Sequence, residues 1–149
     1  MHLEHLVHLV HLEHLEHLEH LEHLVNPHPP MFIVDDEEAV RLSLSRLLGA
    51  IGVPTETYES AVAFLAKYTD ARPGCLLVDL RMPGMSGLDL LLELRRRNIG
   101  IPVILMTGHT DERSVQHLES HQPFGFLEKP FHIQDLKALV ERWRATFAL

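Results

Sequence analysis

The sequence has few of the features that characterise secreted or membrane-bound proteins. Its 149 residues include a single cysteine, Cys75, which excludes a disulfide framework and a cysteine-based zinc site. No apolar run approaches the roughly 18 residues that a membrane span needs. The amino-terminal segment lacks Lys and Arg, and His and Glu interrupt its leucines, unlike a secretory signal. We therefore expect a cytoplasmic protein that makes no membrane contact.

Positive charge is also absent from the first 30 residues, whereas histidine is abundant there. Eight His-Leu-Glu or His-Leu-Val triplets occupy residues 2–25 and carry eight of the 13 histidines and five of the 21 acidic residues. The other 16 acidic side chains and all 13 Lys and Arg follow, so residues 31–149 carry −3 of the net charge of −8. This acidic balance argues against direct binding to nucleic acid.

The triplets of residues 1–25 predict a low-complexity extension, because a period of three matches neither a helix nor a strand. Two alternatives remain open for it. Histidines three residues apart can share a transition metal, and a leucine-rich helix can self-associate. Residues 26–30, Asn-Pro-His-Pro-Pro, end any helix and predict a stiff linker. Residues 31–149 are then one domain of ordinary size.

From residue 31 onward, short apolar runs alternate with helical patterns. The runs predict strands at residues 31–34, 53–58, 75–79, 101–107 and 124–128. Helical spacing and capping residues predict helices at residues 40–51, after Ser60, after Ser86, at 111–121 and at 133–147. Five such units predict an α/β fold, a doubly wound five-stranded parallel sheet with five helices. The helix at 111–121 has the weakest apolar stripe, so we expect it to be the least firmly held.

Polar side chains end four of the predicted strands, at the edge where a doubly wound sheet binds its ligands. They are Asp35, Asp36, Asp79, Thr107 and Lys129. Three neighbouring carboxylates repel one another unless one is protonated or a cation joins them. Oxygen ligands without His or Cys favour Mg²⁺, and such a set with Lys and a hydroxyl suits phosphoryl transfer. An Asp carboxylate can itself be the nucleophile and form an aspartyl phosphate.

At these residues the sequence resembles the receiver domain of two-component response regulators, a flavodoxin-like or CheY-like fold, with motifs of a FixJ-like kind. The matching segments are residues 32–37, 76–87, 104–108 and 126–131. The resemblance spans residues 31–149 and implies the strand order 2-1-3-4-5, which periodicity alone does not give. It also implies a sensor histidine kinase or a phosphotransfer protein as the phosphoryl donor.

The resemblance implies a role for each carboxylate. Asp79 is the implied phosphoacceptor. Asp36 is an implied direct ligand of Mg²⁺, for which Mn²⁺ can substitute, and Asp35 acts mostly through a bound water. Asp79 and the backbone carbonyl of Arg81 complete the implied metal site.

The other strand-end residues have implied roles around the phosphoryl group. Lys129 contacts the acyl phosphate, and its peptide bond to Pro130 is expected to be cis. Thr107 turns toward the phosphoryl group, for which the side-chain-free Gly108 leaves room.

Phosphorylation is implied to shift a conformational population. Phe126 is the implied aromatic switch residue, which moves inward together with Thr107. This movement reshapes the face formed by the fourth helix, fifth strand and fifth helix, through which phosphorylation-dependent homodimers are also implied. Arg81 and His109 flank the path of the attacking water, so the resemblance implies that they tune the lifetime of the phosphoryl group.

Three classes of function are compatible with parts of this pattern. A signalling receiver, which catalyses only its own phosphorylation and autodephosphorylation, fits best. A Mg²⁺-dependent phosphohydrolase with Asp79 as nucleophile is the alternative, although Arg81 stands where a second Asp would support it. A flavodoxin-like binding module that never turns over is disfavoured, because the acidic residues repel an anionic ligand that is bound without a metal. No output-domain pattern follows the last helix, so we expect a single-domain regulator or a receiver cut from a longer transcription factor.

Overall fold

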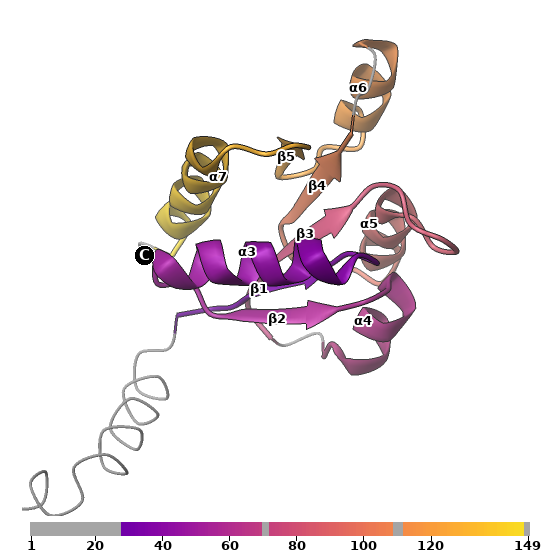
Figure 1. Ribbon diagram of the computed structural model, residues 1–149. Coiled ribbons are helices and arrows are strands. Elements are labelled where there is room, and N and C mark those ends of the chain that lie inside the picture. Colours follow the sequence, from indigo (N-terminus) through magenta and orange to yellow (C-terminus); the bar gives the residue numbers. More distant parts are fainter. Residues whose placement is uncertain (1–27, 70–71, 109–111, 148–149) are drawn as a thin grey trace, which may run out of the picture.

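The computed structural model describes residues 28–69, 72–108 and 112–147 (Figure 1). Its strands are β1 (Met31–Val34), β2 (Thr55–Tyr58), β3 (Cys75–Asp79), β4 (Val103–Thr107) and β5 (Gly125–Glu128). Its helices are α3 (Glu38–Ala50), α4 (Ala61–Lys67), α5 (Gly87–Arg96), α6 (Glu112–Glu119) and α7 (Ile133–Ala145). The strands form one parallel sheet in the order β2-β1-β3-β4-β5, which confirms the predicted fold and strand order. The extension and the alternatives for it lie outside the described residues.

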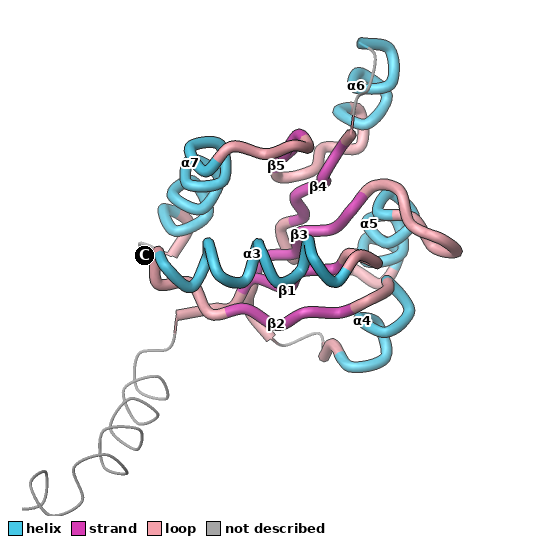
Figure 2. Tube along the Cα trace, in the orientation of Figure 1, coloured by secondary structure: helices cyan, strands magenta, loops and turns pink. Residues whose placement is uncertain are grey.

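Helices cover both faces of the sheet (Figure 2). Alternate strand residues point to opposite faces, so Met31 and Ile33 pack with α3 and α7, while Phe32 and Val34 pack with α4, α5 and α6. All four β1 side chains are buried. This two-sided burial explains why β1, β3 and β4 are almost entirely apolar in sequence. None of the described helices is long and apolar enough to span a membrane.

Local side-chain caps fix where two helices begin, as the sequence predicts. The Ser60 hydroxyl accepts a hydrogen bond from the Ala63 N–H at 3.0 Å, ahead of α4. Before α5, the Ser86 N–H donates to the Asp89 carboxylate and the Asp89 N–H donates to the Ser86 hydroxyl, both at 3.0 Å. This capping box sets the first turn of α5 close behind the end of β3.

Two strands begin later than the sequence pattern predicts, because a proline directly precedes each of them. β2 begins at Thr55 and β4 at Val103, each two residues after its predicted start. Pro54 and Pro102 have no N–H to donate, although their carbonyls accept bonds from Met31 and Leu76.

The last predicted helix is too long at its carboxyl end. Phe147 is predicted on its apolar face, but α7 ends at Ala145 and Phe147 is 39% exposed. The N–H groups of Thr146 and Phe147 donate to the carbonyls three residues back, at Trp143 and Arg144. These bonds tighten the end of the helix, and the Phe147 ring lies edge-on to Trp143 at the border of the core.

The end of the proline-rich linker is held against α7. The His28 ring lies edge-on to both Trp143 and Phe147, and its Nε2 accepts a hydrogen bond from Arg144 Nε at 3.0 Å. Two residues later, the Pro30 carbonyl accepts a bond from the Cys75 N–H at 3.2 Å. The chain therefore enters the domain at the amino-terminal ends of the strands, beside the start of the central strand β3.

The helix α6 has the weakest packing of the described helices that cover the sheet. Leu118, 4% exposed, is the one buried side chain among the α6 side chains that the structure describes. The neighbouring α5 buries Leu90, Leu91 and Leu94. This difference agrees with the weak apolar stripe seen in the sequence, and few buried contacts favour local opening.

We predict that Leu118→Ala releases α6 without unfolding the domain. Native-state hydrogen exchange should show faster exchange of the α6 amides, while the β3 and β4 amides keep their protection. As a control, Leu94→Ala on α5 should lower the global free energy of unfolding by about 2–5 kcal/mol and speed exchange throughout. Equal loss of protection in both variants would contradict the prediction.

Candidate functional site

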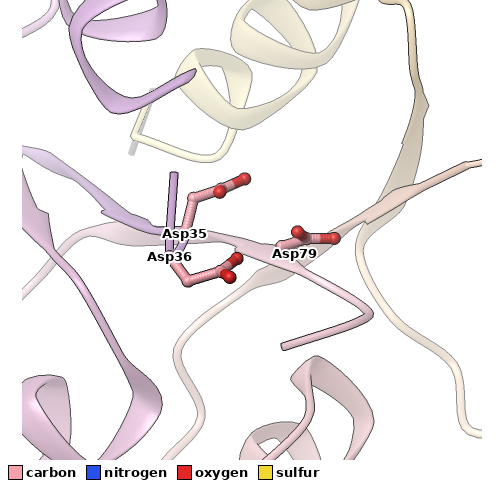
Figure 3. A group of neighbouring side chains, drawn as sticks. All are labelled: Asp35, Asp36 and Asp79. Atoms are coloured by element: carbon pink, nitrogen blue, oxygen red, sulfur yellow. The ribbon is translucent and has the colours of Figure 1, made fainter. Parts of the chain in front are cut away.

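Three carboxylates meet at the carboxyl edge of the sheet. β1 and β3 are hydrogen-bonded neighbours, and Val34 lies opposite Val78, so Asp35, which follows β1, lies beside Asp79, the last residue of β3. The ligand oxygens of Asp35, Asp36 and Asp79 all lie within 4.8 Å of one another (Figure 3). The register of two adjacent strands thus gathers the acidic cluster that the sequence predicts.

The two central carboxylates are buried and held by the backbone. Asp35 is fully buried and Asp79 is 7% exposed, whereas Asp36 faces solvent. One oxygen of Asp35 accepts a bond from the Glu37 N–H at 2.8 Å, and one oxygen of Asp79 accepts from the Arg81 N–H at 3.2 Å. Each side chain folds back onto its own chain two residues later, which fixes its orientation.

Lys129 joins the two buried carboxylates. Its Nζ lies 3.1 Å from Asp35 Oδ2 and 3.1 Å from Asp79 Oδ2. The Lys129 N–H donates to the Thr107 carbonyl at 2.7 Å, and the bond to Pro130 is cis, as the resemblance implies. The positive charge of the Lys129 side chain therefore offsets part of the repulsion between the two carboxylates.

The electrostatic balance leaves Asp79 only partly compensated. Burial raises the pKa of Asp79, Lys129 and the Arg81 N–H oppose this rise, and the charge of Asp35 adds to it. Burial also works to lower the pKa of Lys129, but its hydrogen bonds to Asp35 and Asp79 outweigh burial and raise it. The three carboxylates supply the hard oxygen ligands that suit a divalent cation.

The remaining predicted residues differ in burial and in the element that carries them. Thr107 is buried at the end of β4, next to β3 in the sheet. Phe126 is half-buried in β5 and packs against the apolar cluster under α4, α5 and α6. The Arg81 side chain is exposed. A side chain at Gly108 would meet no atom within 4 Å, and His109 lies outside the described residues.

Gly87 is a site residue to which the sequence analysis gave no role. A Cβ atom at this position would lie 2.6 Å from the Asp79 carbonyl oxygen and 3.0 Å from the Leu80 Cα. The Gly87 N–H donates to the Leu80 carbonyl at 3.1 Å. The first turn of α5 thus lies directly against the end of β3. The sequence feature that could have indicated this close approach is the glycine directly after the capping residue Ser86.

We predict that Gly87→Ala destabilises the domain by about 1–3 kcal/mol, because the new methyl group overlaps backbone atoms of Asp79 and Leu80, and the backbone must shift to admit it. Urea unfolding measures the loss. Gly49→Ala in α3 is the matched control: its Cβ meets nothing within 4 Å, and alanine there should add about 0.5–1 kcal/mol. Wild-type stability of Gly87→Ala would show that the contact with Asp79 is not tight.

We also predict that Asp79→Asn stabilises the domain at pH 7 when divalent cations are absent. The pKa of Asp79 is raised above its ordinary value of 3.8, so its contribution to stability is complete below that pH and is lost as the pH rises through the raised value. The amide removes this loss. Urea unfolding at pH 7 and pH 4 should show a gain for Asp79→Asn at pH 7 that shrinks at pH 4.

The control for this measurement is Asp36→Asn, at the exposed carboxylate of the cluster. Its free energy of unfolding should stay within about 0.5 kcal/mol of the wild type, as for most exposed positions. A lower stability of Asp79→Asn at pH 7 would mean that the pairing with Lys129 outweighs the burial of the charge.

Comparison of the chain with known proteins identifies a family to which its sequence is similar. Residues 31–141 match the response regulator receiver domain. The transcriptional regulatory protein FixJ of Azorhizobium caulinodans is 41% identical over 117 residues, which cover 78% of this chain and 54% of FixJ. The DNA-binding transcriptional regulator NtrC of Salmonella typhimurium is 39% identical over 112 residues, which cover 75% of this chain and 24% of NtrC.

Solved structures show the same similarity in three dimensions. The crystal structure of FixJ-N is 41% identical, has a TM-score of 0.72, and matches 82% of this chain and 96% of its own. The chain therefore spans about a quarter of the length of NtrC and about half of the length of FixJ.

Proposed function

Because the chain belongs to the response regulator receiver domain family, we propose that Asp79 accepts a phosphoryl group from a phosphohistidine of a sensor kinase or phosphotransfer protein. A carboxylate oxygen of Asp79 forms the new bond to phosphorus as the bond between phosphorus and the histidine nitrogen breaks. The electron pair of that bond stays on the imidazole. The observation that carries the proposal is the buried Asp79 carboxylate 3.1 Å from Lys129 and within 4.8 Å of two further carboxylates.

The donor set supports a role for Mg²⁺, or Mn²⁺ in its place. Asp35, Asp36, Asp79 and the backbone carbonyl of Arg81 would hold the ion. When bound, it supplies positive charge that offsets the repulsion among the carboxylates and the incoming phosphoryl oxygens. Lys129, already between Asp35 and Asp79, gives a phosphoryl oxygen on Asp79 a positive partner within reach.

We propose that the response to phosphorylation passes through the end of β4. The Thr107 hydroxyl and Lys129 bind the phosphoryl group, and Phe126, half-buried in β5, moves inward. The face formed by α6, β5 and α7 then changes shape, and a partner or a second copy recognises it. Arg81 and His109 tune how long the phosphoryl group lasts. In this proposal the receiver, residues 31–149, works in the cytoplasm.

The proposal predicts phosphorylation of Asp79 by a small donor. The full chain incubated with acetyl phosphate and Mg²⁺ should gain about 80 Da by mass spectrometry, the mass added by one phosphoryl group. Asp79→Asn should abolish the gain, and so should a chelator. Asp135→Asn, at an exposed aspartate in the first turn of α7, should leave it intact.

An unchanged mass of the wild-type chain under these conditions would contradict the proposal. Release of phosphate from small phosphoesters over many turnovers would instead support the phosphohydrolase alternative with Asp79 as nucleophile.

A further inference from the structure

A groove of about 410 Å³ lies between the start of α5 and α6, beside the acidic cluster. It begins at Leu80, the residue that follows Asp79. Its lining combines apolar side chains with basic ones. The apolar side chains are Leu80, Leu88 and Leu118, and the basic ones are Arg81, Arg113 and His117.

The groove is strongly one-sided in charge. None of the described residues that line it is acidic. Arg81 and Arg113 are exposed, and within the described part of the chain neither forms an ion pair. A leucine-lined groove with two such arginines suits a segment that carries both apolar and acidic side chains.

The chain itself contains a segment of this chemistry. Residues 2–25 hold eight leucines and five glutamates and no Lys or Arg. Every triplet supplies one leucine, and five of the eight triplets add a glutamate directly after it. The charge and the apolar character of this extension therefore complement those of the groove.

The extension is long enough to reach the groove. Pro30 is bonded to Cys75 at the start of β3, and the groove begins just after the end of that five-residue strand. At about 3.3 Å per residue, the two points are roughly 16 Å apart along the strand. His28 lies against α7, on the face of the sheet opposite α5 and α6, so the extension must also pass around the sheet. An extended chain of 25 residues spans roughly 80 Å at about 3.3 Å per residue, which covers both distances. A short tether also gives an effective concentration on the order of millimolar, so a weak contact suffices.

We propose that residues 2–25 dock in the groove between α5 and α6 of their own chain. The leucines contact Leu80, Leu88 and Leu118, and the glutamates lie near Arg81 and Arg113. The docked extension adds apolar contacts to α6, which buries little of its own surface. This docking does not depend on phosphoryl transfer at Asp79, so its test measures contact alone.

The test places a spin label on the extension of the full chain and detects its neighbours by NMR. Val10→Cys keeps every glutamate, and Cys75 stays unlabelled because it is buried and burial raises its pKa to about 12. The label should broaden the amide signals of Leu80, Leu88 and Leu118 relative to a diamagnetic label. The proposal would be overturned if no signal of the domain broadens. It would also be overturned if the broadening is centred outside the groove, for example on residues 99–102.

Charge variants separate docking from chance proximity. Arg113→Glu should reduce the docked population about threefold, the effect of one or two weak exposed charge pairs, while Arg46→Glu on the exposed side of α3 should not. Because Arg113→Glu could also perturb α6, a second variant changes only the extension: Glu13, Glu16, Glu19 and Glu22 to Lys should abolish the broadening. Unchanged broadening in this variant would overturn the proposal.

A mixed sample identifies whose extension is bound. Spin-labelled chain without ¹⁵N is mixed with unlabelled ¹⁵N chain, so only contact between copies broadens signals. Docking within one chain predicts no broadening in the mixture and no change on dilution of the singly labelled chain. Broadening in the mixture that weakens on dilution would show docking between two copies and would overturn the proposal as stated.

Discussion

The carboxyl edge of the sheet is organised around the pair of hydrogen bonds from Lys129 to Asp35 and Asp79. Two carboxylates with little access to solvent lie side by side because two apolar strands end together, and their repulsion opposes the fold. Lys129 offsets that repulsion from the end of β5, two strands away from β3. The same contact links the ends of β1, β3 and β5, so a change of charge at Asp79 acts directly on β5.

The sequence predicted this arrangement well wherever the signal is local or depends on strand ends. Asp35, Asp79 and Lys129 follow apolar runs, and parallel strands bring their carboxyl ends to one edge. The capping residues Ser60 and Ser86 are likewise short-range signals, and both caps are present. The strand order was predicted from the resemblance alone, since the hydrophobic periodicity of a sequence does not indicate which strands are neighbours.

What the sequence missed depends on contacts between distant atoms. The close approach of Gly87 to the Asp79 carbonyl arises only when α5 packs behind β3. Similarly, the end of α7 at Ala145 follows from carbonyl bonding in its last turn, which the apolar character of Phe147 conceals. The groove beside Arg81 needs α5 and α6 in their places, and the charges that line it are separated by more than 30 residues in the sequence.

The tight contact at Gly87 means that the elements around Asp79 differ in how firmly they are packed. On the α5 side, backbone meets backbone with no room for even one methyl group, so β3 has a stiff support. The neighbouring strand β4 leads to α6, on the same face of the sheet, whose described part is anchored by a single buried leucine. Because α5 is closely packed against β3 and α6 is not, a displacement that starts at Asp79 meets less resistance along β4 toward α6 than toward α5.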